Sequence, residues 1–256
     1  RFSSDLREKA GAILEKHYNG KTLEFMPNFG EGTLVRVRFI ISLGVSPKSL
    51  PDANLVEQEI VQATRSWGDE LSDALIAGGD GSVGRSLSRR YANAFPPAYR
   101  ETNQISDAQH DIDIMEALDT GTSTAAEFAE PIGSHGAVRL KLFNLASPVA
   151  LSARLPLLED MGLRALDENT YIVQPSVKTA SAAKGDAVYL HEVALNRDDS
   201  AAVDQQSYQQ LKDCFLAVWT GKADSDRLNG LGLSASLTWQ EVTVLRAFAR
   251  YLRQTC

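Results

Sequence analysis

The sequence predicts an α+β fold with two antiparallel sheets, and three observations lead to this prediction. Several short stretches alternate apolar and polar residues, which is typical of strands with one buried face. Between them, apolar residues recur every three or four positions, as they do in amphipathic helices. Hydrophobic residues make up 43% and charged residues 23% of the 256 residues, a composition typical of a globular protein with a buried core.

The first part of the chain is expected to form a helix and two strands. A helix over 3–18 ends at Asn19-Gly20, because Gly readily takes the left-handed conformation that follows a helix. Strands are expected over 22–29 and 33–42, on either side of a glycine-containing turn. The side chains expected on the buried face of the second strand are Val35, Val37, Phe39 and Ile41.

A helical segment is expected over 53–120. Two prolines predict a loop over 46–52 before it. Asn54 and Glu57 are spaced as a cap at the start of one helix, and Ser106 with Gln109 predicts the start of another. The helices expected in this segment cover 54–75, 83–95 and 106–118.

Residues 121–136 are mostly polar and small, and we expect a connector at a domain boundary there. The elements expected after it are strand 138–143, helix 149–161, strands 163–174 and 187–195, and helix 204–220. This β-α-β-β-α order predicts a ferredoxin-like sandwich, in which helices cover one face of an antiparallel sheet. The first half shows the same order without its opening strand, so two copies of one topology are the simplest account.

The last stretch predicts a helix that begins at a capping box. Thr238 and Glu241 have the required spacing, so that their side chains can satisfy the free amides of the first turn. The apolar stripe of this helix consists of Val242, Leu245, Phe248, Ala249 and Leu252. Its arginines, expected as a solvated face or a domain contact, are Arg246, Arg250 and Arg253. No stop signal follows and the chain opens without Met, so we expect a piece of a longer polypeptide.

One glycine-rich motif is compatible with phosphate binding. Residues 79–84 match G-x-G-x-x-G, in which backbone amides approach a phosphate directly after a buried strand. The residues before it follow a helical period instead. From Gly78 to Gly84 we therefore predict a helix end and a turn, with a nucleotide site as the alternative.

The sequence predicts no catalytic, cofactor-binding or metal-binding residue. Its histidines are His17, His110, His135 and His191. They lack metal-ligand spacing, and no cysteine assists them, so each is expected to be structural. The two cysteines, Cys214 and Cys256, are too few for a disulfide framework. The G-x-S-x-G pattern of a nucleophile elbow does not occur.

The charge balance narrows the classes of partner. A net charge of −7 and a pI of about 5.2 argue against nucleic acid, because proteins that bind it usually present a basic face. No apolar run approaches the roughly 18 residues that a membrane span needs. We expect a cytoplasmic protein whose partners include neither nucleic acid nor a membrane.

Six stretches carry a family resemblance. They are Ala63-Thr-Arg-Ser-Trp-Gly-Asp-Glu-Leu71, Arg89-Arg-Tyr-Ala-Asn-Ala-Phe-Pro-Pro-Ala-Tyr-Arg-Glu101, Leu140-Lys-Leu-Phe143, Leu157-Leu-Glu-Asp-Met-Gly-Leu163, Ala217-Val-Trp-Thr-Gly221 and the closing stretch from Leu237 to Gln254. In this order they resemble the large NAD-dependent glutamate dehydrogenases of bacteria. Each match is weak by itself, but their shared order over nearly the whole chain is specific.

The resemblance implies a regulatory segment that precedes the catalytic region of such an enzyme and is built from ACT-type modules, which are small βαββαβ domains. The implied units are a partial ACT-like unit over 1–52, a helical segment over 53–120, a connector over 121–136, a second ACT-like unit over 137–221 and the start of a helical linker over 222–256.

The parent enzyme is then expected to deaminate L-glutamate oxidatively to 2-oxoglutarate and ammonia with NAD. The family binds glutamate through lysines in glycine-rich surroundings, and no Lys-Gly-Gly stretch occurs here. No catalytic residue is therefore carried over, and the fragment itself is expected to be non-catalytic and without a cofactor. Its expected partners are its own catalytic region and the other subunits of a homo-oligomer.

Three roles remain open at this point. The first is regulation or assembly, with a possible amino-acid effector at the loop Asn144-Leu-Ala-Ser147. That location is taken from family analogy, and a tight connection is the favoured interpretation of the loop. The second is a purely structural oligomerisation spacer, for which Val244 and Phe248 are candidate partner contacts. The third is a nucleotide-binding enzyme that uses the glycines from Gly78 to Gly84.

Overall fold

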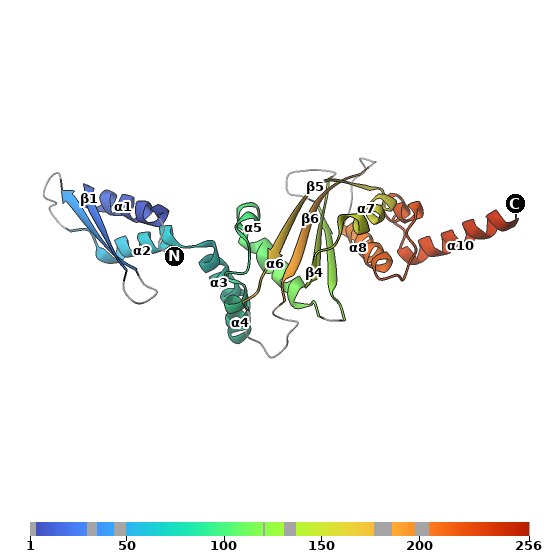
Figure 1. Cartoon of the computed structure of the whole chain (residues 1–256), viewed down its shortest axis with the longest axis horizontal. Helices are drawn as coiled ribbons and strands as arrows, with labels where there is room; N and C mark the ends of the chain where they lie inside the picture. The colour runs from blue at the N-terminus through green and yellow to red at the C-terminus, as the bar shows by residue number, and fades with distance from the viewer. Residues whose placement is uncertain are drawn as a thin grey trace. The chain divides into compact units, whose positions relative to one another are not determined.

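The computed structural model describes residues 4–29, 35–43, 50–119, 121–130, 137–176, 186–197 and 205–255. The chain forms two compact units, Arg1–Glu70 and Leu71–Cys256, drawn in Figure 1. The predicted α+β fold class with antiparallel sheets is confirmed. Expectations for residues 3, 33–34, 46–49, 131–136 with His135, 204 and Cys256 lie outside the described residues.

The first unit consists of two helices and a two-stranded antiparallel sheet. In chain order these are α1 (Ser4–Tyr18), β1 (Gly20–Phe29), β2 (Val35–Leu43) and α2 (Ala53–Thr64). α1 contacts both strands and α2. The predicted inner face of β2 is confirmed, because its odd-numbered residues from Val35 to Ile41 are half-buried and the even-numbered residues between them are exposed.

Two helix ends in this unit differ from the expectation. Asn19 takes the left-handed conformation after α1, with φ of 47°. Gly20 already belongs to β1, where a Cβ atom would lie 2.5 Å from the carbonyl oxygen of Ser42. The close approach of the two strands, and not the helix end, therefore requires this glycine. The cap expected at Asn54 is wrong, because Asp52 is the N-cap of α2 and its Oδ1 accepts from the Asn54 N–H at 2.9 Å.

The single helix expected over 54–75 is interrupted after Thr64. Ser66 and Asp69 form a capping box, in which the Ser66 N–H donates to Asp69 Oδ2 at 3.0 Å and the Asp69 N–H donates to Ser66 Oγ at 3.2 Å. This reciprocal cap begins a new helix. That helix, α3 (Trp67–Gly78), contains the boundary between the two units.

Three further helices precede the sheet of the second unit. They are α4 (Gly81–Tyr91), α5 (Pro97–Thr102) and α6 (Ile105–Glu116). Pro97 begins α5, because a missing N–H is tolerated in the first turn of a helix. α6 begins at a capping box of Gln104 and Asp107, so the start predicted at Ser106 and Gln109 is wrong, and both residues lie inside the helix.

The second unit is built around a four-stranded antiparallel sheet. Its strands are β3 (Thr124–Ala129), β4 (Val138–Leu145), β5 (Leu163–Val173) and β6 (Val188–Arg197), in the spatial order β3-β4-β6-β5. α7 (Leu151–Asp160) joins β4 to β5, and α8 (Gln205–Trp219) follows β6. The predicted β-α-β-β-α order is thus confirmed from β4 to α8.

β3 lies in the range 121–136, where the sequence predicts a connector. It pairs with β4 from Thr124 opposite Asn144 to Ala129 opposite Arg139. In this sheet the fourth strand is β3, which precedes β4 in the sequence. In a βαββαβ module the fourth strand follows the second helix. The strand reads Thr-Ala-Ala-Glu-Phe-Ala, and its small side chains give too little apolar alternation to reveal it.

Helices cover both faces of this sheet (Figure 1). On one face, Leu140 and Leu142 belong to a hydrophobic cluster that includes Leu211 and Phe215 of α8. Successive side chains of a strand point to opposite faces. Lys141 therefore points to the other face, where it contacts α6. The sequence predicts helices on one face only, and the second layer comes from helices that precede the sheet.

The end of the second unit consists of η2 (Arg227–Gly230), α9 (Leu231–Ser234) and α10 (Trp239–Thr255). The predicted capping box of α10 is confirmed. The Thr238 N–H donates to Glu241 Oε2 at 2.8 Å, and the Glu241 N–H donates to Thr238 Oγ1 at 3.3 Å.

The glycine-rich motif connects two helices, as predicted. α3 ends at Gly78 and α4 begins at Gly81, so a helix and not a strand precedes the motif. Gly84 lies inside α4, where a Cβ atom would be 2.5 Å from the Leu75 carbonyl oxygen of α3. The absence of a side chain at Gly84 allows the two helices to approach closely.

The substitution Gly84→Ala is expected to destabilise the second unit, because the added methyl group overlaps the Leu75 carbonyl. We expect the free energy of unfolding to fall by about 1–3 kcal/mol, measured by urea unfolding followed by circular dichroism. Gly81→Ala is the matched control: its Cβ would lie 3.5 Å from the Arg85 side chain, and stability is expected to stay constant or rise by up to about 1 kcal/mol. Equal losses in both variants would contradict this explanation.

Candidate functional site

The loop predicted as an effector site joins β4 to α7 and is closed by its own hydrogen bonds. Asn144 Nδ2 donates to the carbonyl oxygen of Ser147 at 2.8 Å, and Thr124 Oγ1 of β3 donates to Asn144 Oδ1. Ala146 has a left-handed backbone, with φ of 65°. Because both ends of the Asn144 amide are engaged within the protein, this loop has the geometry of a tight connection.

Beside this loop, His191 of β6 is buried and held in one tautomer. Its Nε2 accepts from the backbone N–H of Val149 at 3.1 Å, so the ring proton resides on Nδ1. Nδ1 lies 2.9 Å from Thr170 Oγ1 and 3.1 Å from Glu168 Oε1. Burial and the nearby charge of Arg154 lower the pKa of His191. The residue is therefore a neutral connector between α7 and the sheet.

Arg154 of α7 completes this network, and the side chains of Arg154 and His191 are both buried. One of its guanidinium nitrogens donates to Glu168 Oε1, which also accepts from Thr170 Oγ1 at 3.0 Å. Burial raises the pKa of Glu168, but the Thr170 hydrogen bond and the Arg154 charge outweigh it, so the pKa is lowered overall. The network fixes α7 on β5 and β6.

A second buried network lies on the opposite face of the sheet. Lys141 Nζ is 2.9 Å and 2.8 Å from the two carboxylate oxygens of Asp111 on α6. Tyr99 of α5 donates its hydroxyl to Asp111 Oδ2 at 2.6 Å. Burial raises the pKa of Asp111, and the Lys141 charge opposes that shift. All three side chains are buried, so this network fixes α5 and α6 to the central strand β4.

α10 is anchored by a third buried cation, Arg246. Its Nε and Nη2 contact the two carboxylate oxygens of Asp226 at 2.6 Å and 3.0 Å, and Nη2 donates to Asn229 Oδ1 at 2.6 Å. Arg250 forms an exposed pair with Asp224 at 2.8 Å. The interpretation of the arginines as a solvated face is wrong for Arg246, which is 4% exposed. This arginine fixes α10 to η2.

The apolar stripe of α10 faces outward instead. Of the predicted stripe, Val242 is buried, whereas Leu245, Phe248 and Leu252 are exposed. We call the exposed set the α10 apolar face, which consists of Val244, Leu245, Phe248, Tyr251 and Leu252, each between 42% and 63% exposed. A contiguous row of large apolar side chains on an anchored helix is typical of an interaction site.

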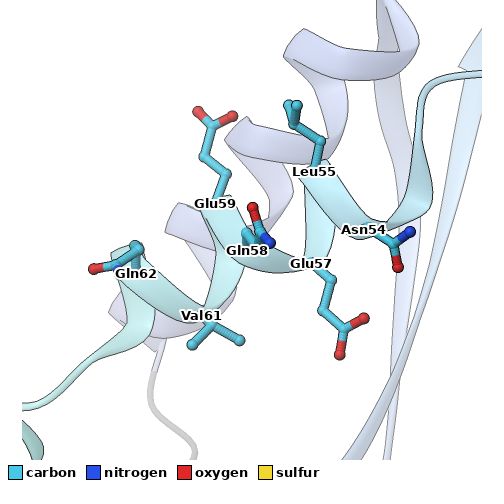
Figure 2. A pocket seen from close by; sticks show the side chains of 7 residues that line it. All are labelled: Asn54, Leu55, Glu57, Gln58, Glu59, Val61 and Gln62. Atoms are coloured by element: carbon cyan, nitrogen blue, oxygen red, sulfur yellow. The ribbon is translucent and has the colours of Figure 1, made fainter.

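A hollow along α2 does not form a comparable site. Its lining residues all belong to this one helix, from Asn54 to Gln62. Figure 2 shows that their side chains point in different directions, with Glu59 and Glu57 on opposite sides of the helix. A binding pocket needs polar groups that converge on a ligand, and these diverge.

The remaining candidate residues have structural partners. His17 contacts Glu59, and His110 lies 2.7 Å from Glu127. Burial raises the pKa of Cys214 to about 11, so its thiol is protonated at neutral pH and is a poor nucleophile. In the part of the chain that the structure describes, no cluster of three metal-ligating side chains occurs. Among the described helices, none is long and apolar enough to cross a membrane.

Models of four consecutive glutamate dehydrogenase modules match this chain. The ACT2 domain matches residues 1–68, helical motif 2 residues 74–118, the ACT3 domain residues 123–208 and helical motif 3 residues 223–256. The chain belongs to the glutamate dehydrogenase family. When the structure is divided into these modules, the Lys141 network joins helical motif 2 to the ACT3 domain, and α10 lies in helical motif 3.

Three relatives named NAD-specific glutamate dehydrogenase match 99% of this chain. The protein of Halomonas elongata is 33% identical over 256 residues, that of Pseudomonas aeruginosa 32% over 257, and that of Mycobacterium tuberculosis 29% over 273. The chain spans only 15–16% of the length of these glutamate dehydrogenases.

The name of these glutamate dehydrogenases implies NAD, so the glycine motif has to be tested against that cofactor. A dinucleotide loop needs free space where the backbone meets the pyrophosphate. Next to Gly84 that space is filled by the backbone of Leu75 and Ile76. The motif from Gly78 to Gly84 therefore does not fit NAD.

Protonation of Asp226 is expected to weaken the anchor of α10. Hydrogen bonds from Arg246 lower the pKa of Asp226, so the pair contributes stability above the unfolded-state pKa of about 3.9 and loses it as pH falls through the folded-state value. The difference in free energy of unfolding between wild type and Asp226→Asn is expected to shrink between about pH 5 and pH 2. Urea unfolding across this range measures it, and a constant difference would contradict the prediction.

Proposed function

We propose that this chain is a non-catalytic regulatory and assembly segment of an NAD-dependent glutamate dehydrogenase. The longer enzyme oxidatively deaminates L-glutamate to 2-oxoglutarate and ammonia with NAD, and its catalytic groups lie outside this segment. Two findings support the proposal: the relatives carry that enzyme name, and the segment corresponds to about 15% of their length. A cytoplasmic location and the absence of a nucleic-acid partner stay predictions.

The α10 apolar face is the observation that carries this proposal. Val242 and Arg246 hold one side of α10 against the rest of the unit, while Phe248 and Leu252 remain 60% and 57% exposed. Burial of a large apolar side chain stabilises a contact by about 1.5–3 kcal/mol. The occupant we propose is the catalytic region of the same enzyme, in its own chain or in another subunit of a homo-oligomer.

A purely structural spacer is the alternative role. The closed geometry of the loop from Asn144 to Ser147 favours it, because the Asn144 amide has no free end for an effector. A spacer and a regulatory segment both need the α10 apolar face. They differ in whether a small molecule changes the segment.

The double substitution Phe248→Asp with Leu252→Asp is expected to impair the longer enzyme. Two charges on the α10 apolar face prevent its burial, so NAD-dependent glutamate oxidation is expected to fall at least about tenfold. If the face docks on another subunit, the oligomer is also expected to dissociate. Light scattering and the absorbance of NADH measure the two effects. The matched control is Leu55→Asp with Val61→Asp on α2, whose side chains are 55% and 52% exposed; it is expected to behave as wild type. Normal assembly and activity of the α10 variant would refute the proposed docking role.

A further inference from the structure

The first unit buries far fewer apolar side chains than the second. Among its described residues, the large apolar side chains that are buried are Ile13 of α1 and Val56 of α2. Its sheet has two strands, and a two-stranded sheet is only marginally stable in water without further strands or a covering layer. α1 supplies such a layer, because it contacts both strands, whereas the main contact of α2 is α1 and not a strand.

The second unit repeats the order of these elements, and there the sheet has four strands. The elements α7, β5, β6 and α8 correspond to α1, β1, β2 and α2. β6 pairs with β5 along one edge and with β4 along the other. α8 covers the two strands that precede α7, since it contacts β3 and its Phe215 shares a hydrophobic cluster with Leu140 of β4. In the first unit the corresponding edge of β2 has no partner strand among the described residues.

The two open edges of the first sheet differ in how readily they accept another strand. β1 contains Pro27, which has no N–H to donate, and an extra residue, Leu23, that shifts the register between Thr22 and Glu24. Prolines and bulges hinder pairing and are typical of strands that stay at the edge of a sheet. β2 has neither feature and is rich in β-branched residues. A further strand is therefore expected to pair with β2.

The chain leaves no room for that strand directly after α2. α2 ends at Thr64 and α3 begins at Trp67, whereas a βαββαβ module has its fourth strand after the second helix. In the second unit both additional strands, β3 and β4, come before the first helix instead.

We propose that β2 pairs with a β-hairpin from the part of the longer enzyme that precedes residue 1. This hairpin lies under α2 as β3 and β4 lie under α8, and it completes a four-stranded sheet. The inference rests on the proposed function, which makes this chain a segment of that enzyme, and it names the partner of the first unit.

The side chains that the hairpin covers define its chemistry. Ile60 follows Val56 by four positions, so both lie on one face of α2, and Ile60 is only half-buried. Phe39 and Ile41, on the inner face of β2, are half-buried too. The hairpin is therefore expected to alternate apolar and polar residues, with its apolar side chains toward α2.

Hydrogen exchange tests the proposal on the longer enzyme and on the chain of residues 1–256. Alternate N–H groups of an edge strand point away from its neighbour and exchange with water. We expect these outward N–H groups of β2 to exchange at least about tenfold more slowly in the longer enzyme than in the chain of residues 1–256. The outward N–H groups of β1 are the control and are expected to exchange equally fast in both.

A matched pair of substitutions on α2 tests the same contact. In the longer enzyme, Ile60→Asn is expected to restore fast exchange at the outer edge of β2, because it places a polar group against the hairpin. Val61→Asn, at a side chain that is 52% exposed, is expected to leave the exchange unchanged. In the chain of residues 1–256, Ile60→Asn is expected to have no effect on these N–H groups, which are already open to water.

Equal exchange of β2 in the longer enzyme and in the chain of residues 1–256 would overturn the proposal, and so would protection of β1 in place of β2. Protection of β2 that rises with the concentration of the chain of residues 1–256 would also overturn it, because the occupant would then be a second copy. Each of these results leaves the docking role of the α10 apolar face intact when Phe248→Asp with Leu252→Asp still lowers activity, so the two proposals fail separately.

Discussion

Lys141 and Asp111 are buried together, and the arrangement of the second unit depends on that pair. A charge removed from water costs several kcal/mol unless an opposite charge and hydrogen bonds replace the solvent. Lys141 lies on the central strand β4, and Asp111 and Tyr99 come from α6 and α5. The sheet therefore needs both helices in place. Two stretches that carry the family resemblance, Leu140 to Phe143 and Arg89 to Glu101, meet at this buried network, because Lys141 and Tyr99 both contact Asp111.

Buried cations fix helices at two other places in the same unit. Arg154 holds α7 to the sheet through Glu168, and Arg246 holds α10 to η2 through Asp226. At α10 the usual positions of charged and apolar side chains are reversed: Arg246 is buried, whereas Phe248 is 60% exposed. An arrangement that fixes the helix and leaves its apolar side exposed is suited to contact with another part of a larger enzyme.

Most helices and strands could be predicted because periodicity is a local property of the sequence. β3 could not, since its alanines give almost no contrast between its two faces. The break between α2 and α3 could not be predicted, because the apolar residues keep a helical spacing across it. Only the capping box of Ser66 and Asp69 marks the start of a new helix. The Lys141–Asp111 pair joins residues far apart in the sequence, and no spacing rule reveals such a contact. Arg246 was misjudged because a helical pattern alone does not show which face is covered.

A double-mutant cycle on Lys141 and Asp111 tests most directly whether this pair holds the helices to the sheet. Lys141→Met and Asp111→Leu are measured singly and together by urea unfolding. Each single change leaves one charge buried without its partner and is expected to cost about 3–5 kcal/mol, whereas the double variant is expected to lose far less than the sum. Additive losses would show that the two residues stabilise the unit independently and would contradict the account.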